Sequence, residues 1–155
     1  MSLLLLKSCP LFFELYDSEI EKMVKYCTVI TFDEGDKIIT DGEEGTQVFV
    51  LLEGEGMVQK DTGTEIINIQ PLKAGDVFGE MSLMGEKTRQ ADIVANSVCY
   101  VLEIEYDKIF SLFKKEPKIF GLLLFNLSRL VSQRLAASNQ IIVGLQKELV
   151  GRKTS

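Results

Sequence analysis

Residues 28–59 read TVITFDEGDKIITDGEEGTQVFVLLEGEGMVQ, with short β-favouring runs separated by glycine and acidic clusters. Runs of this kind occupy residues 28–32, 48–52, 57–59, 65–69 and 98–105. Nine of the twelve glycines lie between Gly35 and Gly85, so the middle of the chain is rich in turns. Many short strands with glycine turns are typical of an antiparallel sandwich, jelly roll or barrel, and not of a βαβ fold.

Helical patterns lie on the N-terminal side of this region and on its C-terminal side. After Pro10 the chain looks helical to about Tyr26, and Ser18 and Glu21 have the spacing of a capping box. Residues 106–113 suit a short helix. The predicted fold class is therefore mainly β, with N-terminal helices and a long C-terminal helix.

The long helix is predicted from Pro117, which the first turn of a helix tolerates, to about Leu149, with Gly144 as the one break in the pattern. It is about 50 Å long at 1.5 Å per residue, more than a compact domain of this size covers. Its apolar positions advance by three and four residues, as in a coiled-coil seam. The seam is Leu124, Leu127, Val131, Leu135, Ser138, Ile142, Leu145 and Leu149.

This seam predicts a homodimer through the C-terminal helix; the alternative is a helix that packs only on its own sheet. Ser138 is a polar residue within the seam. It is either a tolerated hydroxyl or the point where the helix meets a polar ligand.

The charge balance and the absence of histidine exclude several function classes. Lys and Arg number 17 against 23 Asp and Glu, a net charge of −6, whereas nucleic-acid-binding domains usually show a basic footprint. With no histidine, imidazole-based metal sites and catalytic triads are absent, which argues against a cupin-type metalloenzyme and against phosphodiesterase activity. We therefore expect no catalysis, no metal, no cofactor and no nucleic-acid partner.

Cysteine usage and hydropathy predict a cytoplasmic protein. Cys9, Cys27 and Cys99 are odd in number and widely spaced, as expected for buried, reduced thiols. The run Leu3 to Leu6 is too short for a signal peptide, and no apolar stretch approaches the eighteen or so residues of a membrane span. We expect no membrane association.

Residues 78–95, FGEMSLMGEKTRQADIVA, contain the side chains best suited to bind a ligand. Gly79 permits close backbone approach, and the turn at 80–83 presents free N–H groups to an anion. A guanidinium such as Arg89 matches phosphate oxygens, and a carboxylate such as Glu80 suits a ribose hydroxyl. Together these residues describe a sugar-phosphate cradle. The alternative is that Glu80 and Arg89 are surface charges or form an ion pair.

The chain resembles the cyclic nucleotide-binding domain family, which includes the bacterial catabolite activator and the regulatory subunit of protein kinase A. The resemblance covers nearly the whole chain. It rests on the segments CPLF (9–12), GDKII (35–39), DG (41–42), VFVLLEG (48–54) and GDVFGE (75–80), and on the C-terminal helix.

The family resemblance implies a jelly roll with a phosphate-binding cassette at 79–91. Glu80 is then expected to accept the ribose 2′-hydroxyl, Arg89 to hold the exocyclic phosphate oxygens, and the N–H groups near Ser82 and Leu83 to complete the cradle. Base contacts fall on the long helix, one from each subunit of a dimer. The expected ligand-binding residues are Gly79, Glu80, Met81, Ser82, Leu83, Arg89, Gln90, Ala91, Ser138 and Asn139.

Three residues depart from the pattern of many family members: Thr88, Gln90 and Asp92 stand where Pro, a small residue and Thr are common. Gln90 either reaches the base or crowds it, and indicates no clear selectivity between cyclic nucleotides. Asp92 adds negative charge near a bound phosphate, which weakens affinity unless its side chain points outward.

The resemblance implies one domain over 1–155, made of an N-terminal helical segment (1–27), a jelly roll (28–105) and C-terminal helices (106–150). Its expected function is that of a regulatory domain that senses a cyclic nucleotide, with cAMP as the expected ligand. The domain is expected to signal by movement of its C-terminal helix. The alternative is a nucleotide-free module for dimerisation or protein docking. The tail after the helix is too short for a DNA-reading module. The output is therefore expected to pass through another protein or through the dimer itself, or to belong to a further domain if the chain is part of a longer protein.

Overall fold

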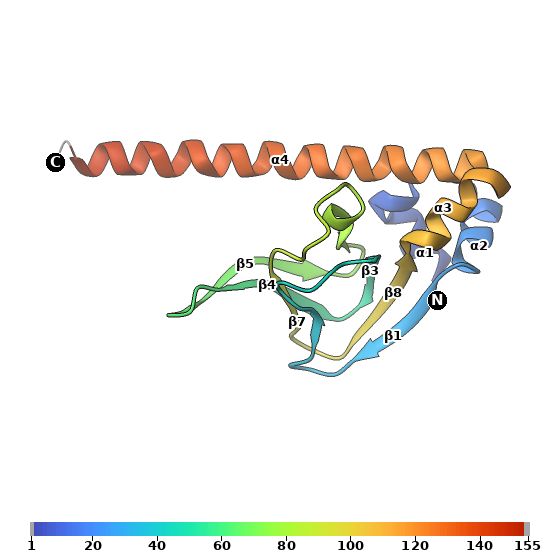
Figure 1. Ribbon diagram of the computed structural model, residues 1–155, viewed down its shortest axis with the longest axis horizontal. Helices are drawn as coiled ribbons and strands as arrows, with labels where there is room; N and C mark the ends of the chain where they lie inside the picture. Colours follow the sequence, from blue (N-terminus) through green and yellow to red (C-terminus); the bar gives the residue numbers. More distant parts are fainter. Residues whose placement is uncertain (1, 154–155) are drawn as a thin grey trace.

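The computed structural model describes residues 2–153 (Figure 1). Three short helical elements come first: α1 (Leu3–Ser8), the 3₁₀ turn η1 (Pro10–Phe12) and α2 (Asp17–Val24). The C-terminal helices are α3 (Tyr106–Lys115) and α4 (Pro117–Lys153). Between them lie β1 (Thr28–Phe32), β2 (Lys37–Ile39), β3 (Gln47–Glu53), β4 (Glu55–Asp61), β5 (Ile66–Lys73), β6 (Val77–Phe78), the 3₁₀ turn η2 (Glu80–Ser82), β7 (Asp92–Ala95) and β8 (Cys99–Glu105).

The strands form two four-stranded antiparallel sheets, with strand orders β1-β8-β3-β6 and β2-β7-β4-β5. This two-sheet arrangement confirms the predicted mainly-β jelly roll. Side chains of alternating strand positions fill the space between the sheets because successive residues point to opposite faces. The buried residues there are Ile39, Phe49, Leu51, Leu72, Phe78, Ile93, Ala95, Cys99 and Val101.

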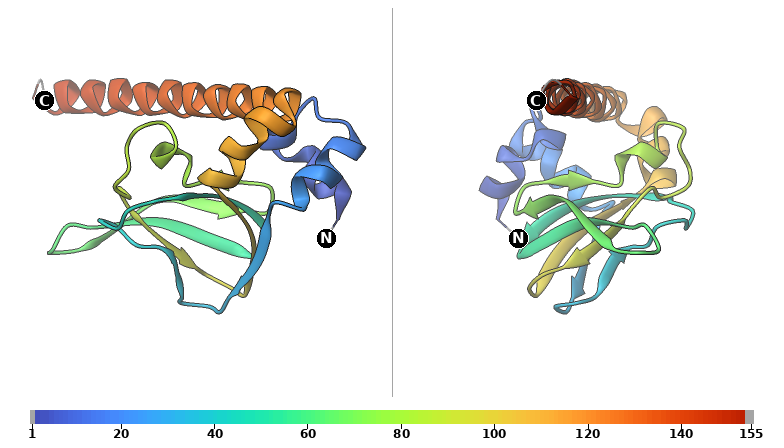
Figure 2. Two further views of the ribbon diagram at one scale, coloured as in Figure 1. Left: turned by 45° about the vertical axis from the view of Figure 1, so that its right-hand side comes forward. Right: turned by 90° about the vertical axis from the view of Figure 1, so that its left-hand side faces the viewer.

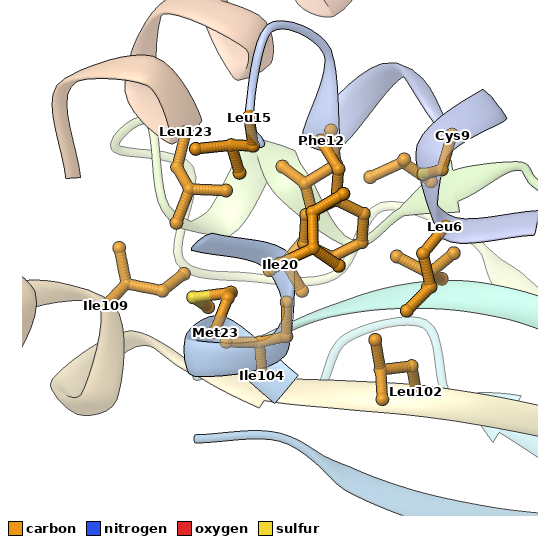
Figure 3. Packing of buried hydrophobic residues seen from close by; sticks show 14 of the residues in the cluster. Leu6, Cys9, Phe12, Leu15, Ile20, Met23, Leu102, Ile104, Ile109 and Leu123 are labelled. Atoms are coloured by element: carbon orange, nitrogen blue, oxygen red, sulfur yellow. The ribbon is translucent and has the colours of Figure 1, made fainter. Parts of the chain in front are cut away.

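A second core joins the N-terminal helices, α3 and the start of α4 to the outer face of β3 and β8 (Figure 3). Phe12 and Ile20 from the N-terminal segment meet Leu102 and Ile104 of β8, and Leu123 of α4 completes the layer. All five are at most 1% exposed. The helices are therefore held on the jelly roll by apolar burial, which places α4 over the region that follows β6.

Helix α4 is 37 residues long and has two different halves. Its first half is anchored, and Asn126 donates hydrogen bonds of 2.9 Å to the carbonyls of Leu11 and Phe13. Residues 135–153 are exposed, and Figures 1 and 2 show the C-terminal end extending beyond the jelly roll. The helix is continuous through Gly144, because one helical glycine costs only about 1 kcal/mol relative to alanine.

The structure corrects the predicted N-terminal helix. The segment from Pro10 to Tyr26 is a 3₁₀ turn and a separate helix, α2, with an extended link between them. The capping residues Ser18 and Glu21 were wrong: α2 begins at Asp17, and the N–H of Tyr16 donates to the Glu19 carboxylate at 2.8 Å. The capping register lies two residues earlier because the helix starts earlier.

Strand prediction missed the shortest strands. β2, β6 and β7 contain three, two and four residues, too few to show a periodic pattern. β5 extends to Lys73 and includes Pro71. Proline has no backbone N–H, and an edge strand such as β5 tolerates it because only one side of the strand is paired.

Two of the three free cysteines, Cys9 and Cys99, are buried as predicted, whereas Cys27 is partly exposed. Burial raises the pKa of the Cys9 thiol to about 11 and that of Cys27 to about 12. Both thiols are protonated at neutral pH and are poor nucleophiles. None of the helices in the described part of the chain is long and apolar enough to cross a bilayer.

Candidate functional site

A cavity of about 690 Å³ lies between the second sheet, the η2 segment and α4. Eight of the ten predicted ligand-binding residues line it, and Leu83 and Asn139 do not. Its walls also include residues from β2, β4, β5, β6 and β7 and one face of α4. The full lining is Ile39, Val58, Ile69, Gln70, Leu72, Phe78, Gly79, Glu80, Met81, Ser82, Thr88, Arg89, Gln90, Ala91, Ile93, Leu130, Gln133, Arg134, Ala137, Ser138 and Ile141.

Gly79 begins the segment 79–91, for which we use the name cassette, and it has a left-handed conformation with φ of 81°, which glycine adopts without steric cost. A Cβ atom here would lie 2.9 Å from Nη1 of Arg89 and 3.0 Å from the carbonyl oxygen of Gln47. Glycine is therefore required at this position both for the turn and for the close approach of the guanidinium. The turn then leads directly into η2, which carries Glu80 and Ser82.

Arg89 is 7% exposed and lies against the cavity floor. Its Nη1 donates to the Gly79 carbonyl at 2.8 Å and to the Ser82 hydroxyl at 3.1 Å, and its Nη2 donates to the Gln47 carbonyl at 2.8 Å. The guanidinium also stands 5.7 Å from the centroid of the Phe49 ring. These contacts use three of its five N–H groups, so the fork is held in place and retains donors for another acceptor.

Gly45 packs directly behind the Arg89 side chain, outside the cavity lining, and sequence reasoning missed it. A Cβ atom on Gly45 would lie 2.4 Å from Cζ and Nε of Arg89 and 2.4 Å from the Ser82 hydroxyl. Real Cβ contacts are never this short, so any side chain at Gly45 displaces the guanidinium. The sequence signal was one glycine among the nine of the turn-rich region, which does not distinguish it.

Glu80 is paired with Arg134 of α4. Arg134 donates one hydrogen bond to the Glu80 carboxylate and another to the Val77 carbonyl, and the Glu80 side chain is only 4% exposed. This ion pair links the cassette to the long helix. Sequence reasoning did not assign Arg134 a role, although it lies four residues before Ser138 and thus on the same helical face.

The cavity carries a net positive charge in an acidic chain. Among the residues that line it, Arg89 and Arg134 are cationic and Glu80 is anionic, which leaves one positive charge. The remaining walls are mostly apolar. A pocket of this size with an apolar wall and a few placed polar groups suits a small organic anion.

Tyr106 joins the cassette to α3. Its hydroxyl donates to the Gly79 carbonyl at 2.7 Å, the same oxygen that accepts from Arg89. Burial raises the pKa of Tyr106, so the hydroxyl remains a donor at neutral pH. The start of the helical pair α3–α4 therefore touches the backbone of the cassette directly.

The predicted base-contacting residues take different places. Ser138 lines the cavity from α4, while Asn139 is exposed and lies outside the lining because successive helical residues point about 100° apart. Gln90 lines the cavity and donates from its side-chain amide to the Thr88 carbonyl at 3.1 Å. The expectation that Ser138 and Asn139 contact the base from different subunits of a dimer stays a prediction.

Asp92 faces away from the cavity. Ile93 lines the cavity, and its neighbour Asp92 points to the outer surface of the sheet because strand side chains alternate. Its carboxylate accepts from the N–H of Asp41 at 2.8 Å and from the ammonium of Lys37 at 2.9 Å. These two contacts, the backbone N–H first, hold the pKa of Asp92 below its ordinary value. The negative charge is therefore compensated on the outer face.

Comparison with known sequences places these features in a family context. The family model described as cyclic nucleotide-binding domain matches residues 29–116. Human cGMP-dependent protein kinase 2 is 30% identical over 130 residues, covering 80% of this chain and 17% of the kinase. Glutaminase 1 of Bradyrhizobium diazoefficiens is 32% identical over 131 residues, covering 84% of this chain and 21% of the glutaminase. The chain thus spans about a fifth of the length of these relatives.

Solved structures with the same fold agree with the sequence matches. A cyclic nucleotide-binding domain from Methylobacillus flagellatus superimposes with a TM-score of 0.81 at 25% identity, covering 91% of this chain and 80% of that one. The Thermus thermophilus catabolite activator protein gives a TM-score of 0.78 at 25% identity, covering 88% of this chain and 63% of that one.

Proposed function

The chain belongs to the cyclic nucleotide-binding domain family. We propose that it is a regulatory sensor that binds a cyclic nucleotide in the cavity under α4, with cAMP as the preferred candidate ligand. The observation that carries this proposal is the fixed, buried guanidinium of Arg89 at the floor of a cavity with one net positive charge. A cyclic phosphodiester bears one negative charge and presents two exocyclic oxygens to such a fork. Glu80, beside it, is an acceptor suited to the ribose hydroxyl.

Signal transmission is proposed to pass from the cassette to α4. Glu80 touches Arg134 and the Gly79 carbonyl touches Tyr106, so two contacts connect the ligand-facing segment to the C-terminal helices. A ligand moves α4 only if it binds one helix position more tightly than the other. When the ribose contacts Glu80, it competes with Arg134 for that carboxylate. This competition makes the ligand affinity depend on the position of α4.

Calorimetric titration with cAMP, cGMP and cyclic di-GMP tests the binding proposal. The protein is first checked for a folded circular dichroism spectrum and, by absorbance and mass spectrometry, for retained nucleotide. Micromolar or tighter binding of one nucleotide, about −8 kcal/mol or better, supports the sensor and names its ligand. No heat with any of the three contradicts it.

A second candidate function, a nucleotide-free docking module, is favoured by one observation. Arg89 already has three protein acceptors, and Glu80 already has a cation. In this alternative the two charges stabilise the cassette and bind nothing else. It predicts that Arg89→Ala lowers the unfolding temperature and that saturating nucleotide leaves the unfolding temperature of the unmodified chain unchanged.

Gly45→Ala is expected to weaken cAMP binding by about threefold to tenfold, which corresponds to the loss of one hydrogen bond between Arg89 and the ligand. The added methyl group displaces the Arg89 guanidinium from behind. Calorimetry of the variant measures the effect. Gly121→Ala is the matched control, because a Cβ at this helical glycine meets nothing within 4 Å. Equal affinities for the two variants would show that Arg89 does not hold the ligand.

We further propose that two copies associate through the distal half of α4. Seven apolar side chains there are more than half exposed in the single chain: Leu135, Ile141, Ile142, Val143, Leu145, Leu149 and Val150. Four of them, Leu135, Ile142, Leu145 and Leu149, belong to the predicted seam. Burying such a stripe in a helical pair removes apolar surface from water, and a protein effector is the alternative occupant.

Leu145→Lys is expected to convert a dimer into a monomer, since it places a charge in the seam. Gln140→Lys, on the opposite side of the same helix, is the control and is expected to leave the mass unchanged. Sedimentation equilibrium over a range of protein concentrations measures both. A monomeric unmodified protein, or a dimer that survives Leu145→Lys, would contradict association through this seam.

A further inference from the structure

Four charged side chains form a connected network around the start of β7, which we call the Asp92 network: Lys37, Asp41, Lys60 and Asp92. Asp92 accepts from Lys37 and from the N–H of Asp41. The Asp41 carboxylate in turn accepts from the Lys60 ammonium at 2.6 Å, and Lys60 also donates to the Gln90 carbonyl at 3.0 Å. The network therefore ties the strands on both sides of β7 to the residue that follows Arg89.

The backbone of Arg89 is held by the loop that Asp41 begins. The N–H of Gly42 donates to the Arg89 carbonyl at 2.9 Å, and the N–H of Arg89 donates to the Glu43 carbonyl at 2.8 Å. Asp92 holds the start of the 41–45 loop, and Lys60 contacts both Asp41 and the carbonyl of Gln90, the residue after Arg89. A shift of this network moves the backbone from which the guanidinium extends.

None of the four network residues lines the cavity, so the network has no direct route to a ligand. Its two lysines are about half exposed, with side-chain exposures of 51% for Lys37 and 42% for Lys60. Exposed ion pairs contribute little to overall stability. What distinguishes this network is its geometry, because Asp92 is 9% exposed and Lys60 bridges a side chain and a backbone carbonyl beside the cassette.

We propose that Asp92 and Lys60 are positioning residues, which set the place of the Arg89 guanidinium and thereby the affinity of the cassette for its cyclic nucleotide. This inference rests on the proposed function of the cassette. Asp92 uses a separate carboxylate oxygen for each partner, Oδ2 for the Lys37 ammonium and Oδ1 for the N–H of Asp41. The network acts on the ligand only through Arg89.

The test compares Asp92→Asn and Lys60→Met with Lys60→Arg, which keeps the charge and the donors, and with Lys73→Met, an exposed lysine of β5 outside the network. The first readout is the side-chain Nε–H resonance of Arg89 in ligand-free, ¹⁵N-labelled protein. The second is cAMP affinity by calorimetry, with unfolding temperature recorded for each variant. Should Asp92→Asn fail to fold, the two Lys60 variants carry the test.

We expect Lys60→Met and Asp92→Asn to shift or broaden the Arg89 resonance and to weaken cAMP binding about threefold to tenfold, as for one lost hydrogen bond. Lys60→Arg is expected to retain the Arg89 resonance and the affinity of the unmodified protein. Lys73→Met is expected to change neither of these two readouts. The proposal is overturned if the Arg89 resonance does not move in Lys60→Met and Asp92→Asn, or if it moves without a change in cAMP affinity. It is also overturned if Lys60→Arg loses as much affinity as Lys60→Met.

The two proposals fail in different ways. If the unmodified protein binds none of the three nucleotides, the sensor function fails, and the Arg89 resonance still decides whether the Asp92 network positions the guanidinium. If the unmodified protein binds cAMP and Lys60→Met binds it equally well, the sensor function stands and the positioning role is refuted.

Discussion

Arg89→Ala is expected to weaken cAMP binding by about tenfold to a hundredfold. A hydrogen bond to a charged group contributes about 1.5–3 kcal/mol, and every 1.4 kcal/mol is a factor of ten in affinity. The guanidinium is pre-oriented by the Gly79 and Gln47 carbonyls and the Ser82 hydroxyl, so little conformational entropy is lost on binding. Calorimetric titration of the two proteins under identical salt measures the ratio.

Two variants make this result specific. Arg89→Lys keeps the charge but loses the planar fork, and is expected to fall between the unmodified protein and Arg89→Ala. Arg152→Ala removes an exposed arginine near the end of α4 and is expected to leave affinity unchanged. Thermal unfolding shows whether Arg89→Ala is folded at the temperature of the titration. A folded Arg89→Ala protein with unchanged affinity would place the phosphate elsewhere.

Arg134→Ala is expected to lower the free energy of unfolding by about 1–3 kcal/mol, because it leaves the buried Glu80 carboxylate without its cation. The loss lies below that of a fully buried pair, since the Arg134 side chain is 34% exposed. α4 also loses its bond to the Val77 carbonyl. Urea denaturation measures the stability, and hydrogen exchange of α4 amides after residue 130 reports release of the helix.

A double-mutant cycle separates the ion pair from other effects. Glu80→Gln removes the negative charge, so Arg134→Ala is expected to cost less in the Glu80→Gln background than in the unmodified protein. Arg129→Ala, on the same helix and stacked on Phe125, is the matched control without a carboxylate partner at the cassette. Additive losses in the cycle would mean that the two residues do not act as a pair.

The local parts of the site were predictable from the sequence. Gly79, Glu80 and Arg89 lie within eleven consecutive residues, whose types suit a sugar-phosphate cradle, and the family resemblance assigned their expected roles. The structure brings them together in one cavity with Ser82, Gln90 and Ser138, as expected. Gly45 was not predicted, because its role depends on which side chain lies behind it and not on its neighbours in sequence.

Long-range partners could not be predicted. The Gln47 carbonyl lies 42 residues from Arg89 along the chain, and Glu80 lies 54 residues from Arg134. A backbone carbonyl leaves no trace in the sequence, since every residue has one. The predicted capping residues of α2 were wrong for a related reason: several residue pairs have suitable spacing, and the start of the helix is selected by how Ile20 and Met23 pack.

By itself the sequence determined the mainly-β class and the long C-terminal helix, because strand periodicity, turn residues and helical apolar spacing are local properties. Tertiary structure alone decided that Asp92 points outward, that Arg134 clamps Glu80 and that three acceptors orient Arg89. The first and third outcomes depend on how the strands and turns of the jelly roll pack, and the second depends on where α4 lies on the jelly roll. Apolar burial determines that placement, and the polar contacts form between the groups it brings together.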